Sequence, residues 1–328
     1  MGGFKVVVWQ SAYLGDVILV SNLLLNLHEH FPDREITLVA QPFAEELYKG
    51  VPWLRVIPLE KTLRGTWEVV KKIKGFNLGF GVQRGMRTSL ALFLARVKLR
   101  VGFDKAELSS LYHFTAKHEW GIHEVERNQR LLRALGLKIF TGKLFLPIHD
   151  GLLQRVKEKF NLPERFVVVS PSAQFEPKRW HEKYFAKVIS RLTAEGFPVV
   201  ITGGRGKDEL IARKVLEFLG GERSDVINLA GKTTVGELVH LIKLADLVIA
   251  NDSAPVHIAE AVDTPVVTVY CATSPYYGFY PRSGIHLFPK NLSCHPCKPN
   301  PKHCLIGEPL CRTAVKPEEV INAVLNLL

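Results

Sequence analysis

The sequence has few cysteines and no long apolar run, and both absences exclude a class of protein. Five cysteines in 328 residues are too few for a secreted scaffold held together by disulfides. The longest apolar runs are well short of the ~20 residues that a membrane-spanning helix needs. An apolar stretch begins at residues 6–8, but Gln10 interrupts it and no small-residue cleavage site follows. We therefore expect a cytoplasmic protein whose contact with membranes is peripheral.

The charge balance is basic. Lys and Arg number 43 against 32 Asp and Glu, which gives a net charge of +11 and a pI near 9.4. A surplus of this size favours anionic partners, which include nucleic acid, nucleotide phosphates and acidic membrane surfaces. The sequence contains no RNP box, no zinc-finger spacing and no long Lys/Arg run, so nucleic acid is not the expected partner.

Two series of β-branched runs alternate with helical patterns along the chain. In the first series, strands are predicted at 5–9, 35–40, 56–59, 77–82 and 99–102, and helices at 17–27, 44–48, 66–73 and 88–97. After a linker-like stretch at 147–163, strands are predicted at 166–169, 198–202, 226–228, 247–250 and 266–270, and helices at 182–194, 208–218, 235–244, 257–262 and 317–328. This alternation predicts parallel sheets covered on both faces. We therefore predict an α/β protein with two doubly wound, Rossmann-like domains, residues 1–155 and 156–328, facing a central cleft.

The loop after the first predicted strand is a candidate site, because open parallel sheets bind ligands at the carboxyl ends of their strands. This loop ends in Gly15 and Asp16, just before an apolar helix. Gly15 permits a tight backbone turn. Asp16 falls where a helix N-cap is expected, and its carboxylate can cap the helix, accept a proton from a bound hydroxyl, or do both.

Two loops of the second series carry groups that suit a bound diphosphate. Ser172 and Lys178 follow one strand, where a hydroxyl and an ammonium can bind phosphate oxygens; a solvated basic loop is the alternative. A second loop opens a helix, whose free N–H groups and positive end also favour phosphate. Its candidate residues are Asp252, Ser253, Ala254 and His257. Taken alone, Asp252 could be only a helix cap and His257 only a structural histidine.

Two further loops are weaker candidates. Gly203 and Gly204 form a strand-to-helix turn that lacks the Walker spacing but lies where it can approach an adenosine or a ribose. In the first series, Arg84 and Arg87 follow a predicted strand. These two cations can clamp an anionic acceptor, or they can be solvated surface charge.

Together these motifs resemble the ADP-heptose:lipopolysaccharide heptosyltransferases, glycosyltransferase family 9, almost from end to end. The matching segments are 15–16 (Gly-Asp), 76–78 (Phe-Asn-Leu), 87–89 (Arg-Thr-Ser), 100–103 (Arg-Val-Gly-Phe), 123–128 (His-Glu-Val-Glu-Arg-Asn), 131–136 (Leu-Leu-Arg-Ala-Leu-Gly), 178–180 (Lys-Arg-Trp), 251–259 (Asn-Asp-Ser-Ala-Pro-Val-His-Ile-Ala) and 273–275 (Thr-Ser-Pro). The chain departs from the family pattern at residues 252–255, where Asp-Ser-Ala-Pro replaces the usual Asp-Thr-Gly-Pro. Serine keeps the hydroxyl of threonine, so this departure bears on the identity of the sugar more than on the reaction.

The resemblance implies a GT-B fold in which the N-terminal domain holds the acceptor and the C-terminal domain holds the donor. The implied donor is ADP-L-glycero-D-manno-heptose, and the implied acceptor is a Kdo or heptose of the lipopolysaccharide inner core on lipid A. It also implies inversion at the anomeric carbon, with Asp16 as the base and with Lys178, Asp252, Ser253 and His257 in the donor site. Gly15, Arg84 and Arg87 are then expected at the acceptor, and an anionic inner-membrane surface is the expected site of peripheral association.

This scheme needs neither a metal nor a protein acid. The departing ADP is a good leaving group when fixed donors meet its growing negative charge. Lys178 and the helix start at 253–257 can meet that charge, and the sequence has no Asp-x-Asp pair in a suitable loop. We therefore expect that no cofactor is required.

Four cysteines gather near the C-terminus, at Cys294, Cys297, Cys304 and Cys311. Four thiolates at short spacing can hold a structural Zn²⁺, although these spacings match no standard zinc ribbon. The alternative is a set of disulfides or buried thiols that ties down a Pro-rich loop. The fifth, Cys271, is expected in the core.

Other functions remain open from the sequence. The enzyme alternatives are another GT-B activity, such as a nucleotide-sugar epimerase, or a transferase of a different sugar. The non-enzymatic alternative is a nucleotide- or nucleic-acid-binding protein.

Overall fold

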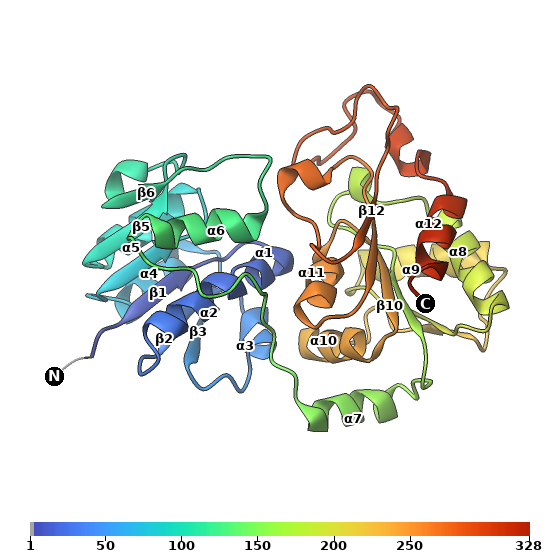
Figure 1. Cartoon of the computed structure of the whole chain (residues 1–328), viewed down its shortest axis with the longest axis horizontal. Helices are drawn as coiled ribbons and strands as arrows, with labels where there is room; N and C mark the ends of the chain where they lie inside the picture. Colours follow the sequence, from blue (N-terminus) through green and yellow to red (C-terminus); the bar gives the residue numbers. More distant parts are fainter. Residues whose placement is uncertain (1–2) are drawn as a thin grey trace. The chain divides into compact units, whose positions relative to one another are not determined.

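The computed structural model describes residues 3–328, and the chain forms two compact units (Figure 1). The first ends at Pro147 and the second spans Ile148–Leu328. Each contains a six-stranded, wholly parallel sheet with helices on both faces. The α/β class predicted from the alternating pattern is confirmed.

The first sheet has the strand order β3-β2-β1-β4-β5-β6. Its strands are β1 (Val6–Trp9), β2 (Ile36–Ala40), β3 (Leu54–Pro58), β4 (Leu78–Gly81), β5 (Leu99–Phe103) and β6 (Phe114–Ala116). Its helices are α1 (Leu14–Leu19), α2 (Ser21–His30), α3 (Phe43–Leu47), α4 (Leu63–Lys72), α5 (Met86–Leu94) and α6 (Glu124–Arg133), with a short 3-10 turn at Ser109–Leu111.

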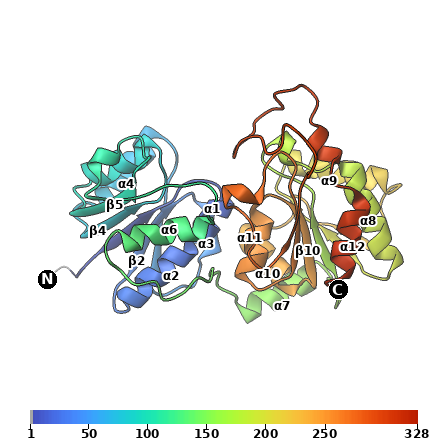
Figure 2. The ribbon, with the colours of Figure 1, turned by 45° about the horizontal axis from the view of Figure 1, so that its top comes forward.

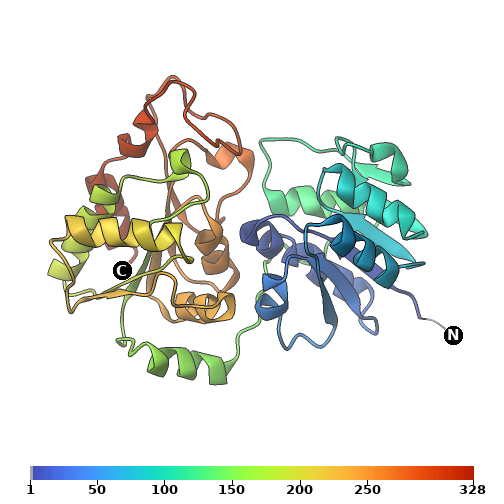
Figure 3. The same cartoon turned by 180° about the vertical axis from the view of Figure 1, so that it is seen from behind.

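Helices cover both faces of this sheet because side chains alternate along each strand. Val7 and Trp9 pack into a core with the inner sides of α4 and α5. Figure 3 shows the ribbon of the first unit from this side. Val6 and Val8 are equally buried and point the other way. On that second face α2 and α6 lie side by side (Figures 1 and 2).

The second sheet has the order β12-β11-β10-β7-β8-β9. Its strands are β7 (Val167–Ser170), β8 (Val199–Ile201), β9 (Val226–Asn228), β10 (Leu247–Asn251), β11 (Val266–Val269) and β12 (Ile285–Leu287). Its α-helices are α7 (Asp150–Lys159), α8 (Glu182–Ala194), α9 (Lys207–Phe218), α10 (Val235–Leu244), α11 (Ala254–Ala261) and α12 (Pro317–Leu325). Three 3-10 turns, Glu176–Lys178, Pro275–Tyr277 and Leu310–Thr313, lie in its loops. Helices α8 and α12 pack side by side (Figure 2).

The predicted linker at 147–163 is wrong for its central part, which forms α7. This helix packs on α10, buries Val156 completely, and joins Lys159 to Glu237 by a 2.6 Å ion pair. The flanking prolines suggested a linker, whereas the short apolar series Leu152, Leu153 and Val156 forms a helix. The boundary expected at 155/156 falls inside this helix. Strands β6 and β12 and helix α6 were also absent from the prediction.

The helix predicted at 17–27 is two consecutive helices, α1 and α2, joined at Val20. Val20 keeps right-handed helical dihedrals, with φ −73° and ψ −14°. Polar residues then fix the start of α2, because the Ser21 hydroxyl accepts a hydrogen bond from Phe145 N and Asn22 Nδ2 donates to Thr141 O. Within residues 3–328, no helix is both long and apolar enough to cross a membrane.

Candidate active site

Each sheet has one switch point, a pair of neighbouring strands from which the chain builds the sheet outward in opposite directions. In the first sheet this point lies between β1 and β4, and in the second between β7 and β10. Loops diverge at such points, and open α/β sheets bind ligands there. The candidate loops after these four strands therefore lie where strand order alone places a ligand site.

Two hydrogen bonds to one acceptor atom join the two loops at the switch point of the first sheet. The Ser11 hydroxyl donates to Gln83 Oε1 over 2.7 Å, and Ser11 N donates to the same oxygen over 3.0 Å. The loop after β1 is also held by Gln41, whose side-chain amide donates to Ala12 O. Fixed in this way, the loop delivers Gly15 and Asp16 to the carboxyl edge of the sheet.

Asp16 is the third residue of α1 rather than its N-cap, which is Tyr13. The prediction of an N-cap position was wrong because the helix starts three residues earlier than predicted, at Leu14 instead of Val17. The Asp16 carboxylate still serves the helix end, since its Oδ2 accepts a hydrogen bond from Tyr13 N over 3.1 Å. This bond uses one lone pair of a half-buried carboxylate, so capping and proton acceptance are compatible.

A buried ion pair adjoins Asp16. Glu124, the first residue of α6, lies 2.6 Å from Nε of the fully buried Arg127, whose guanidinium sits over the ring of Trp120 at 5.0 Å. Burial raises the pKa of Glu124 to about 7; Arg127 opposes this shift, and the charge of Asp16 adds to it. Asp16 and Glu124 are therefore electrostatically coupled carboxyl groups. Neither Glu124 nor Arg127 was among the predicted site residues, although both lie in a segment that carried the family resemblance.

One of the two predicted acceptor arginines, Arg84, lies beside this group. The guanidinium of Arg84 stands over the Trp120 ring at 5.5 Å, and its charge acts on both Glu124 and His118. Burial, helped by the charges of Arg84 and Arg127, lowers the pKa of His118 to about 4.

The second arginine, Arg87, is linked to the loop of Asp16 through Lys61. Its Nη2 donates to Lys61 O over 3.3 Å, and the Lys61 ammonium lies 5.8 Å from the centre of the Tyr13 ring. The first unit therefore places the Lys61 ammonium against the loop that carries Asp16, and Arg84 beside the Glu124 carboxyl that is coupled to Asp16.

In the second unit, Asn251 joins the loops that follow β7 and β10. Its Oδ1 accepts from Trp180 N over 2.8 Å, and its Nδ2 donates to Pro171 O over 2.7 Å. All of these contacts are buried. Asn251 thus fixes both ends of the loop that contains Ser172 and Lys178. This role of Asn251 was not predicted from the sequence, because an asparagine that bonds backbone far away in sequence leaves no local pattern.

Lys178 and Asp252 form an ion pair at this switch point. Lys178 Nζ lies 2.7 Å from Asp252 Oδ2, and the Thr273 hydroxyl donates to the same oxygen over 2.7 Å. The lysine side chain is 15% exposed and the aspartate side chain 7%. Asp252 therefore acts on Lys178 rather than as a helix cap, and it holds the ammonium at the carboxyl edge of the sheet.

The remaining predicted donor residues lie around this pair. Gly203 follows β8, and a Cβ added there would lie 2.9 Å from the Asp208 Cβ and 3.5 Å from Ser172 Oγ. Its neighbour Gly204 donates its N–H to Asp208 Oδ2 over 2.8 Å. The structure thus brings Ser172 and the glycine turn together and leaves room there only for glycine.

Helix α11 begins directly after Asp252. Ser253 is its N-cap residue, but its hydroxyl turns to Asn251 O at 3.3 Å rather than to a helix N–H. Ala254 is the first helical residue and Pro255 the second, which fits the fixed φ of proline at a helix start. His257 is buried one turn later.

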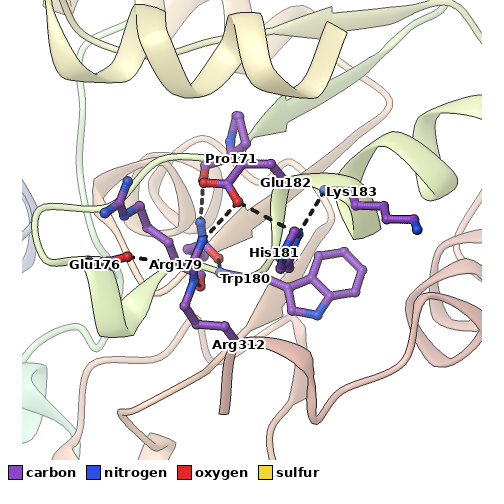
Figure 4. A network of polar contacts seen from close by, with 9 residues as sticks. Pro171, Glu176, Arg179, Trp180, His181, Glu182, Lys183 and Arg312 are labelled. Atoms are coloured by element: carbon purple, nitrogen blue, oxygen red, sulfur yellow. Dashed lines mark hydrogen bonds and ion pairs between the residues drawn. The ribbon is translucent and has the colours of Figure 1, made fainter. Parts of the chain in front are cut away.

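A network anchored by Arg312 holds the loop of Lys178 from below (Figure 4). Its guanidinium donates to Arg179 O over 2.9 Å, and it forms ion pairs with Glu176 at 3.2 Å and Glu182 at 2.9 Å. Its carbonyl accepts from His181 N over 3.1 Å. Because Lys178 lies between Glu176 and Arg179, this network fixes the chain on both sides of it.

The cysteine-rich segment supports the same loops. Cys311 Sγ lies 3.8 Å from Pro177 O, and Cys297 N donates to Ala272 O over 2.9 Å. All five cysteines are free thiols, and Cys271 is buried in the core as expected. Burial raises the pKa of Cys311 to about 12, with contributions from the thiols of Cys297, Cys294 and Cys304. Among residues 3–328, no three His, Cys, Asp or Glu side chains are arranged as a metal site.

Comparison with known proteins agrees with this architecture. The structure matches that of Escherichia coli ADP-heptose lipopolysaccharide heptosyltransferase II with a TM-score of 0.79, at 21% identity over 99% of this chain and 98% of that one. The two doubly wound sheets therefore form a GT-B fold.

The family follows from the sequence match. The model of glycosyltransferase family 9 (heptosyltransferase) matches residues 70–303, and the chain belongs to this family. It is 27% identical to lipooligosaccharide heptosyltransferase 2 of Campylobacter jejuni, over 99% of this chain and 98% of that protein. It is 28% identical to lipopolysaccharide heptosyltransferase 3 of E. coli, over 80% of each. The resemblance drawn from the sequence motifs is confirmed.

Proposed function

We propose that this glycosyltransferase moves heptose from ADP-L-glycero-D-manno-heptose to a Kdo or heptose of the lipopolysaccharide inner core, with inversion. One observation carries the proposal: the two switch points bear complementary groups. Asp16 stands at the first, and the Lys178–Asp252 pair stands at the second. A sugar transfer from a nucleotide needs this combination of a base for the acceptor and a fixed cation for the departing diphosphate.

In this reaction Asp16 removes the proton of the acceptor hydroxyl as its oxygen attacks the anomeric carbon. The bond from that carbon to the diphosphate oxygen breaks on the opposite side, which inverts the configuration. The electron pair leaves with ADP, whose charge Lys178 and the start of α11 stabilise. The proton stays on Asp16 until solvent removes it, and no protein acid is needed because ADP departs as an anion.

We assign the acceptor to the first unit and the donor to the second. In this assignment Arg84, Arg87 and the backbone at Gly15 bind an anionic acceptor sugar whose hydroxyl lies at Asp16. Ser172, Gly203, Gly204, Ser253, Ala254 and His257 lie with Lys178 and Asp252 around the second switch point. Gly203 and Gly204 are assigned to the same site because they follow β8, the strand beside β7, at the same edge of the sheet.

The test is mass spectrometry of the product formed from ADP-heptose with a panel of truncated lipid A acceptors. A mass gain of one heptose on a Kdo- or heptose-terminated acceptor supports the proposal, and the panel identifies which sugar is used. Thermal stabilisation by ADP-sugars, UDP-sugars and oligonucleotides provides a second measurement. Selective stabilisation by UDP-sugars would contradict the donor assignment, and stabilisation by oligonucleotides alone would favour a nucleic-acid-binding protein.

Lipid A is anchored in a bilayer, so we also propose that the enzyme works at the cytoplasmic surface of an anionic inner membrane. Its net charge of +11 favours such a surface. Flotation of the purified protein with vesicles tests this association directly.

We propose a structural role for the four C-terminal cysteines, because Cys297 and Cys311 contact the loops that carry Thr273 and Lys178. Metal analysis of the purified protein decides between the two forms of this role. One equivalent of zinc that is lost in Cys294→Ser/Cys297→Ser supports a zinc site. Metal-free protein with titratable thiols supports a thiol cluster.

A further inference from the structure

Helices α4 and α5 expose apolar side chains that a soluble surface would normally bury. These helices pack side by side, with their inner sides in the core of the first sheet. Their outer sides carry six large apolar residues with exposed fractions from 37% to 90%. We call this set the apolar face; it consists of Leu63, Trp67, Met86, Leu90, Phe93 and Leu94.

The spacing of these residues makes a continuous stripe on each helix. Leu63 and Trp67 are four residues apart on α4, and the α5 residues recur at intervals of four, three and one. This is the period that places side chains on one side of a helix. Each helix is therefore apolar on two sides, one against the sheet and one towards the surroundings. Exposed apolar side chains gathered on two adjacent helices are typical of an interaction site.

The stretch of chain that carries the apolar face is rich in exposed cations. Within residues 60–98, all of which the structure describes, nine exposed Lys and Arg side chains stand against two exposed acids. The cations are Lys61, Arg64, Lys71, Lys72, Lys74, Arg84, Arg87, Arg96 and Lys98, and the acids are Glu60 and Glu68. Glu68 is already paired with Lys71 at 3.0 Å. A third exposed acid, Glu107, comes from outside this stretch and accepts a hydrogen bond from Met86 N over 2.8 Å, so cations still outnumber acids by nine to three. A second copy of this chain fits poorly, because a two-fold contact would bring these cations together.

The basic end of the apolar face reaches the loop of the candidate base. Lys61 accepts the hydrogen bond from Arg87 and holds its ammonium over the ring of Tyr13. Tyr13 N in turn donates to the carboxylate of Asp16. A sugar held at Asp16 is thus separated from the surface of α4 and α5 by a few side chains.

We propose that the apolar face docks the first unit on an anionic lipid bilayer. Leu63, Trp67 and Phe93 enter the headgroup region, and the exposed cations of this stretch bind lipid phosphates, as at interfacial helices that combine apolar and basic sides. The proposal rests on the proposed function, since it brings Asp16 to an acceptor whose acyl chains stay in the membrane.

The experiment is co-sedimentation of the full chain with vesicles of phosphatidylglycerol and phosphatidylethanolamine, and with vesicles of phosphatidylcholine alone. The wild type should bind the anionic vesicles and lose most binding in high salt. Leu63→Ser/Trp67→Ser should bind roughly tenfold more weakly because it removes most of the inserted apolar area of α4. Arg64→Glu/Lys72→Glu should also weaken binding by roughly tenfold or more. The matched control is Leu210→Ser/Phe218→Ser, which removes two exposed apolar residues of α9 and should bind like the wild type.

Transfer to a soluble, deacylated acceptor separates docking from catalysis. The α4 variant should keep wild-type turnover on that acceptor and lose turnover on vesicle-bound acceptor. Wild-type vesicle binding by Leu63→Ser/Trp67→Ser would overturn the docking proposal. A wild-type dimer that this variant converts to monomer would also overturn it, in favour of self-association. No transfer by the wild type to any acceptor, with vesicle binding intact, would instead refute the proposed function.

Discussion

The ammonium of Lys178 lies 2.7 Å from Asp252 Oδ2, in a pair whose two side chains are both largely buried. The Thr273 hydroxyl binds the same carboxylate oxygen. Lys178 is therefore oriented before any ligand arrives. A cation fixed in advance stabilises charge that develops on a leaving group without reorganising during the reaction. Asp252 contributes by placing that cation.

Replacing Lys178 by alanine should slow transfer strongly. The ammonium is held at the β7/β10 switch point by a buried partner, and loss of one such donor costs roughly 10²–10³ in rate. Steady-state kinetics with varied donor should show a lower kcat and a higher donor KM. Lys183→Ala, which removes an exposed lysine of α8, is the matched control. Equal kinetics for both variants would show that Lys178 is ordinary surface charge.

Asp252→Asn should lower the free energy of unfolding, because it leaves the Lys178 ammonium buried without its anion. Breaking one side of a buried pair typically costs about 3–5 kcal/mol. The double variant Lys178→Met/Asp252→Asn removes both charges and should regain much of that stability, as measured by urea unfolding. It should not regain activity. Stabilities that simply add in the double variant would argue that the two residues are not energetically coupled.

The sequence predicted the local parts of this architecture and missed the contacts that cross it. Strand–helix alternation predicted most elements of both sheets, because hydrophobic periodicity is a local signal. The pairing of Lys178 with Asp252 depends on β10 lying beside β7, and strand order is not written in either segment. The ion pairs of Arg312 with Glu176 and Glu182 are even less predictable, because Arg312 lies about 130 residues later in the sequence, after the cysteine-rich segment. Glu124 was missed because only its burial makes its carboxyl unusual.

Asp16→Asn should abolish transfer while ADP binding stays close to that of the wild type. The amide oxygen can still accept the hydrogen bond from Tyr13 N, so the end of α1 stays capped, but an amide cannot take the acceptor proton. Turnover should fall roughly 10²–10⁴-fold with little change in melting temperature. Asp16→Ala should lose the cap as well, with about 1 kcal/mol of stability. Turnover near the wild-type value in the asparagine variant would exclude Asp16 as the base.

Arg312→Lys should raise the donor KM and leave the acceptor KM unchanged. Lysine keeps the charge but not the planar fork, so it cannot bind Arg179 O, Glu176 and Glu182 together. The loop of Lys178 then loosens, and the free energy of unfolding should fall by about 1–3 kcal/mol. Arg223→Lys, at a more exposed arginine paired with Asp225, is the control and should leave both KM values unchanged. A stability loss with no change in donor KM would limit Arg312 to a purely structural role.

Glu124→Gln should alter how stability depends on pH. Burial raises the pKa of Glu124 from 4.5 to about 7, so between these values the native state holds a proton that the unfolded state has lost. The stability that this proton contributes is present below pH 4.5 and is lost as the pH rises through about 7. The wild type should therefore lose stability relative to Glu124→Gln across this window, by on the order of 1–3 kcal/mol in urea unfolding series.

A variant of His118 tests the direction in which stability changes with pH. Burial lowers the pKa of His118 from 6.5 to about 4, so here the unfolded state holds the extra proton and stability rises with pH across that window. The stability difference between the wild type and His118→Asn should thus change with pH in the direction opposite to that for Glu124→Gln. Parallel slopes for the two variants, or a flat difference for Glu124→Gln, would show that the Glu124 carboxyl is ionised throughout and that Arg127 outweighs its burial.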